Sequence, residues 1–388
     1  MSGRTIVVAG CGVAGVEAAA AARAADAAAR VVVAGAEPMP FYARIRLPEV
    51  VAGKVAPERL VLRGPAWFDE QRIELRTGVA LDGIDTRAAM ALLSDGEAIP
   101  YDGLVLAIGA RPNVPLIPGA DLRGVVTLRS MADAVSIAAS ARGGGPVVVV
   151  GGGLLGLEAA AAIRALGPAV TVLEVASSLL SRQLDAEGGE VVRGILERRG
   201  IAFRLGVSVR AIEGGGKAEA VTLASGERLD ASVVLVAAGV RPEVSVAAAA
   251  GIAVGRGITV DDRCATSAEG VFAAGDCAEH RGRAYGIWPA SEAQGRVAGA
   301  CAAGADARYD GTIAQNTLKV MDTAVFSIGR VAEAPSGVGT RVRDGDTYRR
   351  LVTDEEGRLI GAVLIGDLKE RRSIAAAVTA RTTWQGAT

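Results

Sequence analysis

Two glycine-rich loops constrain the fold of this chain more than any other feature. They are Gly10-Cys-Gly12-Val-Ala-Gly15 and Gly151-Gly-Gly153-Leu-Leu-Gly156. In a loop of this spacing the first glycine permits a tight turn, the second lets backbone amides approach a pyrophosphate, and the third lets a helix pack closely on a strand. The N-terminus of the following helix supplies a positive end for the phosphates. Each loop is therefore predicted to bind a dinucleotide.

The two loops lie in the same local sequence. Each follows a compact β-branched run, at residues 5–9 and 147–150, and each precedes an Ala-rich stretch of high helix propensity, which covers residues 13–29 after the first loop. A second apolar run follows each stretch, at residues 30–34 and 169–173. The order strand, loop, helix, strand is thus present twice, which indicates two Rossmann-type units.

An acidic residue follows each second strand. Glu37 lies 22 residues after Gly15, and Glu174 lies 18 residues after Gly156. A carboxylate at this place can accept hydrogen bonds from the hydroxyls of an adenosine ribose. It would also repel the 2′-phosphate of NADPH, so Glu174 favours NADH over NADPH. The alternative is that each acid is only a solvated strand end.

The loops begin 141 residues apart, a separation that indicates a duplicated domain rather than a short repeat. The apolar half of the composition is mainly Ala and Val, which suits buried parallel strands under small-residue helices. We therefore expect an α/β fold with two Rossmann-like dinucleotide-binding domains and a small C-terminal α/β domain. The expected segments are 1–118 and 241–310 for the first nucleotide, 119–240 for the second, and 311–388 for the C-terminal domain.

Smaller patterns complete this expected fold. Residues 76–84 and 90–93 alternate around turn signals and predict an antiparallel meander, and residues 221–223 and 228–229 predict a hairpin. Short strands are expected at residues 324–328, 347–352 and 359–364. The C-terminal domain has no nucleotide loop, so we assign it to packing, partner contact or subunit association, which leaves a homodimer open.

Charge, hydropathy and cysteine spacing bear on the partners, the location and the metal content of the protein. A formal net charge of -1 gives no global field for nucleic acid. The longest apolar window, residues 147–162, contains three consecutive glycines and Glu158 and is shorter than the roughly 20 residues that span a bilayer. The apolar run before Cys11 is too short for a signal peptide. We expect a cytoplasmic protein without nucleic-acid or membrane partners, and the widely spaced cysteines indicate no metal site.

Three further motifs resemble the two-dinucleotide flavoprotein reductases, the superfamily of NADH:rubredoxin oxidoreductase, rubredoxin reductase and the ferredoxin reductases of oxygenases. The resemblance covers about residues 4–330. The motifs are Ala107-Ile-Gly-Ala-Arg-Pro112, Val271-Phe-Ala-Ala-Gly-Asp-Cys-Ala-Glu279, and Tyr285-Gly-Ile-Trp-Pro-Ala290 with Gln294-Gly295 after it. The resemblance implies FAD as the first nucleotide and NADH as the second.

The resemblance also implies roles for single residues. Asp276 would bind the flavin ribitol and Arg44 would contact FAD, while Val79 would meet the adenine through its backbone. A helix beginning after Pro289 would direct its positive end at the pyrimidine edge of the flavin. The full cofactor-binding set for the two nucleotides is Gly10, Gly12, Gly15, Glu37, Arg44, Val79, Ala107, Gly109, Gly275, Asp276, Ile287, Trp288, Lys319, Gly151, Gly153, Gly156, Glu174 and Gly239.

Two carboxylates are the expected catalytic residues. The resemblance puts Glu49 near the isoalloxazine and Glu158 near the junction of flavin and nicotinamide. The only histidine, His280, is expected to be a loop residue and not a base, because hydride transfer to a flavin requires none. For Trp288 the alternative is a buried core aromatic.

A missing cysteine bears on the reaction. Disulfide reductases, peroxidases and water-forming oxidases of the superfamily have a reactive Cys in the segment that here runs from Arg44 to Glu49, and this segment contains none. Cys11 is expected to be a small packed residue and Cys277 a structural one. Electrons must then leave the reduced flavin for an external acceptor.

Rubredoxin is the preferred acceptor, because the segment Leu179-Leu-Ser-Arg-Gln-Leu-Asp185 resembles rubredoxin-type and nitrite-type reductases. Rubredoxin is acidic in general, so a basic patch involving Arg44, Arg46, Arg63 or Lys319 could steer it to the reductase. Two alternatives remain open. One is a diaphorase that reduces oxygen, a quinone or another small acceptor, and the other is a flavin redox sensor that does not turn over.

Overall fold

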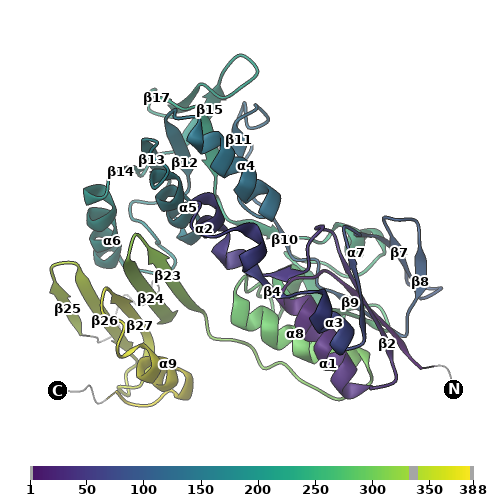
Figure 1. Cartoon of the computed structure of the whole chain (residues 1–388). Coiled ribbons are helices and arrows are strands. Elements are labelled where there is room, and N and C mark those ends of the chain that lie inside the picture. The colour runs from purple at the N-terminus through teal and green to yellow at the C-terminus, as the bar shows by residue number, and fades with distance from the viewer. Residues whose placement is uncertain (1–2, 332–339, 385–388) are drawn as a thin grey trace. The chain divides into compact units, whose positions relative to one another are not determined.

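The computed structural model describes residues 3–331 and 340–384, which form two compact units (Figure 1). The first unit comprises Met1–Arg44, Pro57–Arg111 and Val240–Thr312. The second comprises Ile45–Ala56, Pro112–Gly239 and Ile313–Thr388. Each unit contains one of the glycine loops.

A five-stranded parallel sheet in the order β21-β9-β1-β2-β5 forms the centre of the first unit. Its strands are β1 (Thr5–Ala9), β2 (Arg30–Gly35), β5 (Ile73–Thr77), β9 (Gly103–Leu106) and β21 (Val271–Ala273). Alternate residues of β1 enter two different hydrophobic clusters, because both faces of the sheet are covered. Every residue of β1 after Thr5 is buried.

Helices α1 (Val13–Ala25) and α8 (Trp288–Ala302) pack together on one face of this sheet. A Cβ at Gly295 would overlap the carbonyl oxygen of Ala14, and one at Gly299 would overlap that of Ala18. The helix predicted over residues 13–29 ends four residues earlier. Asp26 ends it, since its carboxylate accepts the Ala28 N–H at 3.0 Å in a local turn that competes with the helix.

The other elements of the first unit are short. A three-stranded antiparallel meander covers part of the second face of the sheet. The short elements are β3 (Phe41–Tyr42), η2 (Pro57–Leu60), β4 (Val61–Arg63), α3 (Pro65–Glu70), β6 (Leu81–Asp85), β7 (Met90–Leu93), β8 (Ala98–Pro100), β10 (Ala110–Pro112), β19 (Val240–Pro242), α7 (Ser245–Ala249), β20 (Ile258–Val260), η3 (Gly275–Cys277) and β22 (Ala278–His280).

Two sequence predictions need correction here. Residues 76–84 are not one strand of the meander, because Arg76 and Thr77 end parallel strand β5 and Gly78, at φ +74°, turns the chain before β6. His280 is not a loop residue: it ends β22, is fully buried, and its Nε2 lies 2.8 Å from Oδ1 of Asp262. Its role is structural.

The second unit repeats the parallel sheet, in the order β11-β18-β12-β13-β14. The strands are β11 (Val125–Val126), β12 (Val147–Val150), β13 (Val170–Glu174), β14 (Ile201–Leu205) and β18 (Val233–Val236). Its helices are α2 (Leu47–Val51), which follows the 3-10 turn η1 (Arg44–Arg46), α4 (Met131–Arg142), α5 (Leu154–Arg164) and α6 (Ala186–Arg198). The predicted hairpin is part of an antiparallel sheet of β15 (Val209–Glu213), β16 (Ala220–Leu223) and β17 (Arg228–Asp230).

The C-terminal residues form a five-stranded antiparallel sheet in the order β23-β24-β27-β26-β25, covered by one helix. The three strands predicted there are present. The elements are β23 (Gln315–Val320), β24 (Thr323–Gly329), β25 (Arg341–Asp344), β26 (Thr347–Thr353), β27 (Leu359–Ile365) and α9 (Arg371–Ala380). The predicted fold class, α/β with two dinucleotide-type sheets and a C-terminal domain, is confirmed.

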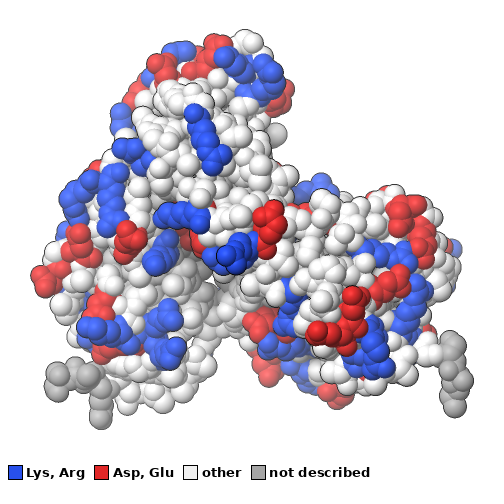
Figure 2. All heavy atoms as spheres, viewed as in Figure 1, with Lys and Arg blue, Asp and Glu red and all other residues white. Residues whose placement is uncertain are grey.

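Surface properties agree with the composition. Within residues 3–331 and 340–384, no helix has the length and apolarity required to cross a bilayer. On the face in Figure 2, both basic and acidic side chains are present.

Candidate functional site

The first glycine loop follows β1 and begins α1. Gly10 has φ +113°, and a Cβ there would overlap the carbonyl oxygen of Ala107, while a Cβ at Gly15 would overlap that of Gly10. A Cβ at Gly12 would meet nothing within 4 Å. Gly12 is also the N-cap of α1 and provides no side-chain cap, so the first amides of the helix face open space. This cradle fits the pyrophosphate of a dinucleotide.

The second loop has the same geometry in the second unit. Gly151, at φ +122°, leaves no room for a Cβ against Ala237, and Gly156 leaves none against Gly151, whereas Gly153 has nothing within 4 Å. Gly153 is the N-cap of α5 and likewise has no side-chain cap. Gly239 lies two residues after Ala237 and has φ +87°. In the same way, Gly109 lies two residues after Ala107 and has φ +76°. The pair 107/109 therefore has a structural counterpart at 237/239.

The predicted ribose acid of the first unit, Glu37, lies two residues beyond β2. Its carboxylate accepts the Tyr42 hydroxyl at 2.8 Å and pairs with Arg44 at 2.6 Å. The Arg44 guanidinium also stacks over the Tyr42 ring, 5.1 Å from its centroid. Glu37, predicted to bind a ribose, and Arg44, predicted to contact FAD, are thus direct partners in the structure. The N–H of Val79, whose backbone was predicted to meet the adenine, donates to the Gly35 carbonyl at 2.9 Å.

The Gly-Asp motif forms the 3-10 turn η3 beside the start of α8. Gly275 has φ +82° and a Cβ there would lie 2.9 Å from Cβ of Ala14. The Gln294 side chain accepts the Gly275 N–H at 2.9 Å, which fixes the turn that carries Asp276. Gln294 was quoted in a motif without a role. Its position five residues after Pro289, in the second turn of α8, is the signal that could have given it a role.

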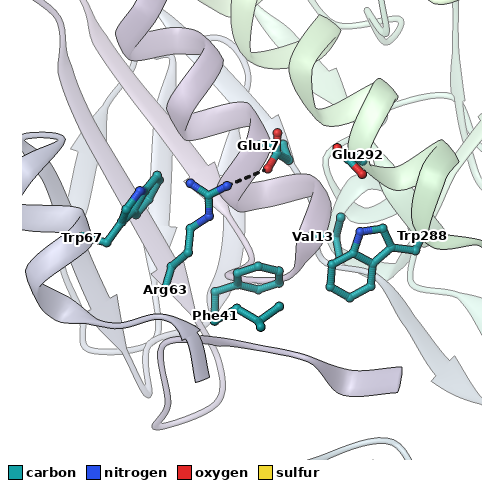
Figure 3. Close-up of a pocket in the computed structure, with 8 residues that line it drawn as sticks. Val13, Glu17, Phe41, Arg63, Trp67, Trp288 and Glu292 are labelled. Carbon is teal, nitrogen blue, oxygen red and sulfur yellow. Dashed lines mark hydrogen bonds and ion pairs between the residues drawn. The ribbon is translucent and has the colours of Figure 1, made fainter. Parts of the chain in front are cut away.

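Trp288 is partly buried and is not a core aromatic. Helix α8 begins at Trp288, two residues before the start predicted after Pro289, so that Pro289 lies in its first turn. Ile287 is its N-cap and provides no side-chain hydrogen bond. The Trp288 and Phe41 rings lie 5.8 Å apart, and both face an open pocket of about 470 Å³ (Figure 3). The lining residues are Val13, Glu17, Phe41, Leu62, Arg63, Trp67, Trp288 and Glu292.

Sequence reasoning missed this pocket. Arg63 stacks over Trp67, 4.3 Å from the ring centroid, and pairs with Glu17 at 3.2 Å. Glu17 also pairs with Arg296 at 3.0 Å. Because the chain has only three tryptophans, the presence of two of them in one pocket is unusual. Their scarcity could have marked them, but no local pattern joins residues 67 and 288.

The two predicted catalytic carboxylates come together in the second unit, on helices α2 and α5, which pack on each other. Arg46 donates to Glu49 at 2.7 and 2.8 Å, and this interaction lowers the pKa of Glu49, helped by Lys54 and Lys319. Burial, and secondarily the charge of Glu49, raises the pKa of Glu158 to about 7. Lys319 extends from β23 of the same unit. Glu158 therefore changes its charge near neutral pH.

Glu174 is tied to the second loop. Its Oε2 accepts the Gly152 N–H at 2.6 Å and its Oε1 accepts the Ala176 N–H at 2.8 Å. It is the last residue of β13. The neighbouring Val175 side chain is 75% exposed. The carboxylate is therefore fixed beside the nucleotide loop.

The cysteines have no redox geometry. All four are free, and burial raises the pKa of Cys11 to about 12 and that of Cys277 to about 11. No cluster suited to a metal ion occurs in the described part of the chain. Of the residues proposed for a basic patch, Arg44 and Arg63 belong to the first unit and Arg46 and Lys319 to the second. Each of the three arginines is already paired with a glutamate.

Comparison with known proteins gives two family matches. A model described as pyridine nucleotide-disulphide oxidoreductase matches residues 4–295, and one described as rubredoxin NAD+ reductase C-terminal domain matches residues 315–382. The chain is 35% identical to a nitrite reductase [NAD(P)H] of Bacillus subtilis over 88% of its own length and 43% of that protein. The chain thus spans less than half of the first curated relatives it matches.

Two other similar proteins are covered over more than three quarters of their length. The ferredoxin–NAD(+) reductase component of the anthranilate 1,2-dioxygenase system of Burkholderia cepacia is 38% identical, over 80% of this chain and 78% of that one. The solved structure of NADH:rubredoxin oxidoreductase from Clostridium acetobutylicum superposes with a TM-score of 0.82 at 28% identity, over 100% of this chain and 97% of the other. The resemblance expected from the sequence is confirmed.

Because a Cβ at Gly12 or Gly153 would meet no protein atom, substitutions at these glycines can test the two nucleotide sites separately. Gly12→Ala should leave the fold intact but weaken FAD binding by about tenfold or more, because the new Cβ would occupy space that a pyrophosphate needs. Gly153→Ala should retain FAD and weaken NADH binding instead. Flavin content and NADH titration measure both. Gly15→Ala is the structural control and should lose stability; an FAD defect in Gly153→Ala alone would reverse the assignment.

Glu158 should make stability depend on pH. Because its pKa in the folded protein lies near 7, above the ordinary value of 4.5, folding favours the protonated form and stability falls as pH rises through this interval. Glu158→Gln should therefore be stabilised at pH 8.5 by on the order of 1 kcal/mol, less than full linkage because the carboxyl is partly exposed, and hardly at pH 4.5. Equal unfolding midpoints of both proteins at pH 8.5 would contradict the raised pKa.

Proposed function

The chain belongs to the pyridine nucleotide-disulphide oxidoreductase family. We propose that it is a flavin-dependent NAD(P)H oxidoreductase of the ferredoxin- and rubredoxin-reductase kind, which passes electrons from NADH through FAD to a small one-electron carrier such as rubredoxin. The observation that carries this proposal is the duplicated cradle. Two glycine loops of the same geometry lie in two units, and only the first is accompanied by the Gly-Asp turn. FAD is assigned to the first and NADH to the second.

In the first unit the residues bind and orient FAD. The amides after Gly12 receive the pyrophosphate, Glu37 the adenosine ribose, and Asp276 the ribitol. The uncapped start of α8 at Ile287 and Trp288 presents backbone amides and a positive helix end, which favour an electron-rich ring edge. Bound FAD supplies the chemistry that takes two electrons from NADH and releases them singly.

In the second unit the residues select and approach the nicotinamide nucleotide. Glu174, fixed by the amides of Gly152 and Ala176, supports NADH over NADPH, since its charge opposes a 2′-phosphate. Glu158 carries a proton below about pH 7 and a charge above it, while Glu49 stays ionised beside Arg46. This pair would tune the approach of the nicotinamide to the flavin.

The acceptor follows from two features. The segment around Glu49 has no cysteine, so no internal disulfide can receive the electrons. The C-terminal match to rubredoxin NAD+ reductases supports rubredoxin over other carriers. The open pocket at Trp67 and Trp288 favours a second candidate, a small planar acceptor such as a quinone, because its aromatic walls suit a flat ring. Cytoplasmic location, the four-segment domain division and a homodimer remain predictions.

A reoxidation experiment decides between the acceptors. The protein, first reduced anaerobically with one equivalent of NADH, should be reoxidised rapidly by oxidised rubredoxin and slowly by a soluble quinone. Trp67→Ala should change neither rate under the carrier proposal. Fast reoxidation by the quinone that Trp67→Ala abolishes would establish the second candidate, and reoxidation by neither would return the sensor alternative.

The nucleotide preference has its own test. Glu174→Gln removes the charge but retains an oxygen that can accept the Gly152 N–H, so it should reduce the preference for NADH over NADPH by about tenfold. The ratio of the two dissociation constants is the proper measurement, because any loosening of the loop affects both nucleotides. An unchanged ratio would show that Glu174 does not select the nucleotide.

A further inference from the structure

A buried ion-pair cluster lies around Asp185, at the start of α6 in the second unit. Its Oδ1 accepts the Gly188 N–H at 3.2 Å and caps the helix. Its Oδ2 accepts the Tyr348 hydroxyl at 2.7 Å and pairs with Arg350 at 2.9 Å, with Arg341 at 3.7 Å. One carboxylate therefore serves two purposes, with a different oxygen for each.

All three partners of Oδ2 come from β25 and β26 of the C-terminal sheet. The side chains of Asp185 and Arg350 are only 12% and 8% exposed, and Tyr348 is buried. A buried charge without its partners is strongly unfavourable, so these strands and Asp185 must stay together. A second ion pair between the same elements, Arg198 with Asp346, is 60% and 64% exposed and contributes little.

The segment just before Asp185 contacts the second glycine loop. Residues 179–184 form a turn in which Leu180 has φ +52°, an uncommon conformation for a residue with a Cβ. The Leu180 N–H donates to the Gly152 carbonyl at 3.1 Å, and the Leu179 side chain covers Gly152 so closely that a Cβ there would lie 2.8 Å away. The Gly152 N–H in turn donates to Glu174.

We propose that Asp185 is a positioning residue through which the C-terminal sheet sets the affinity for NADH. Tyr348 and Arg350 fix Asp185, Asp185 ends the turn at residues 179–184, and this turn presses on Gly152, whose amide orients Glu174. The inference rests on the proposed assignment of NADH to the second loop. It gives the C-terminal sheet a role in nucleotide binding, beyond packing or partner contact.

Asp185→Asn is the direct test on the full-length, FAD-loaded protein. The amide oxygen can still cap Gly188, since Asn caps helices as well as Asp, while the amide nitrogen opposes the donors on Tyr348 and Arg350. Rates of flavin reduction across NADH concentrations should give a dissociation constant raised about three- to tenfold, with the rate at saturation and the FAD content unchanged. Tyr348→Phe, which retains the ring and removes one donor, should give a smaller increase.

Asp346→Asn is the matched control, because it breaks only the exposed pair between the same elements and should leave the dissociation constant unchanged. A lower unfolding temperature for Asp185→Asn with unaltered NADH affinity would reduce Asp185 to a structural residue and overturn the inference. If Asp185→Asn does not fold, Tyr348→Phe decides by the same criterion. Failure of NADH to reduce the unaltered protein would instead contradict the proposed function.

Discussion

The close approach of backbone to backbone at the two glycine loops is the constraint on which the rest of the structure depends. At residues 10, 15, 151 and 156 a Cβ would overlap a carbonyl oxygen, so each of these four positions accepts only glycine. This contact sets where the helix begins against the sheet, and the helix start in turn presents free amides. The predicted cradles follow from that placement, and the proposed roles of Glu37 and Glu174 depend on it.

Carboxylates of the same chemistry take different roles because their surroundings differ. Glu37 is neutralised by Arg44 and Tyr42, and Glu174 is bound by two backbone amides, so both are fixed. Glu158 has neither kind of partner among the described residues, and burial, with the nearby charge of Glu49 as the second cause, raises its pKa to about 7. The second unit therefore has a carboxyl able to respond to pH, Glu158, and a carboxylate whose charge is buried among donors, Asp185.

Local sequence predicted what local physics determines. The loops, β1, β12 and three of the five strands of the C-terminal sheet, β24, β26 and β27, were predicted because glycine spacing and β-branched runs act over a few residues. The end of α1 was misplaced because propensity ignores the turn that Asp26 makes. His280 was assigned to a loop because nothing nearby in sequence reveals that it is buried and paired with Asp262. The pocket at Trp67 and Trp288 and the cluster at Asp185 join residues more than 160 positions apart, which no periodic pattern encodes.

The central claim is that FAD and NADH occupy the two cradles and exchange a hydride. Rapid-mixing reduction of the FAD-loaded protein under anaerobic conditions, with NADH and with NADH deuterated at the transferred position, tests it most directly. The account predicts complete bleaching of the flavin at a rate that saturates with NADH and is slower with the deuterated nucleotide. A protein that binds no FAD, or a flavin that NADH leaves oxidised, would contradict it.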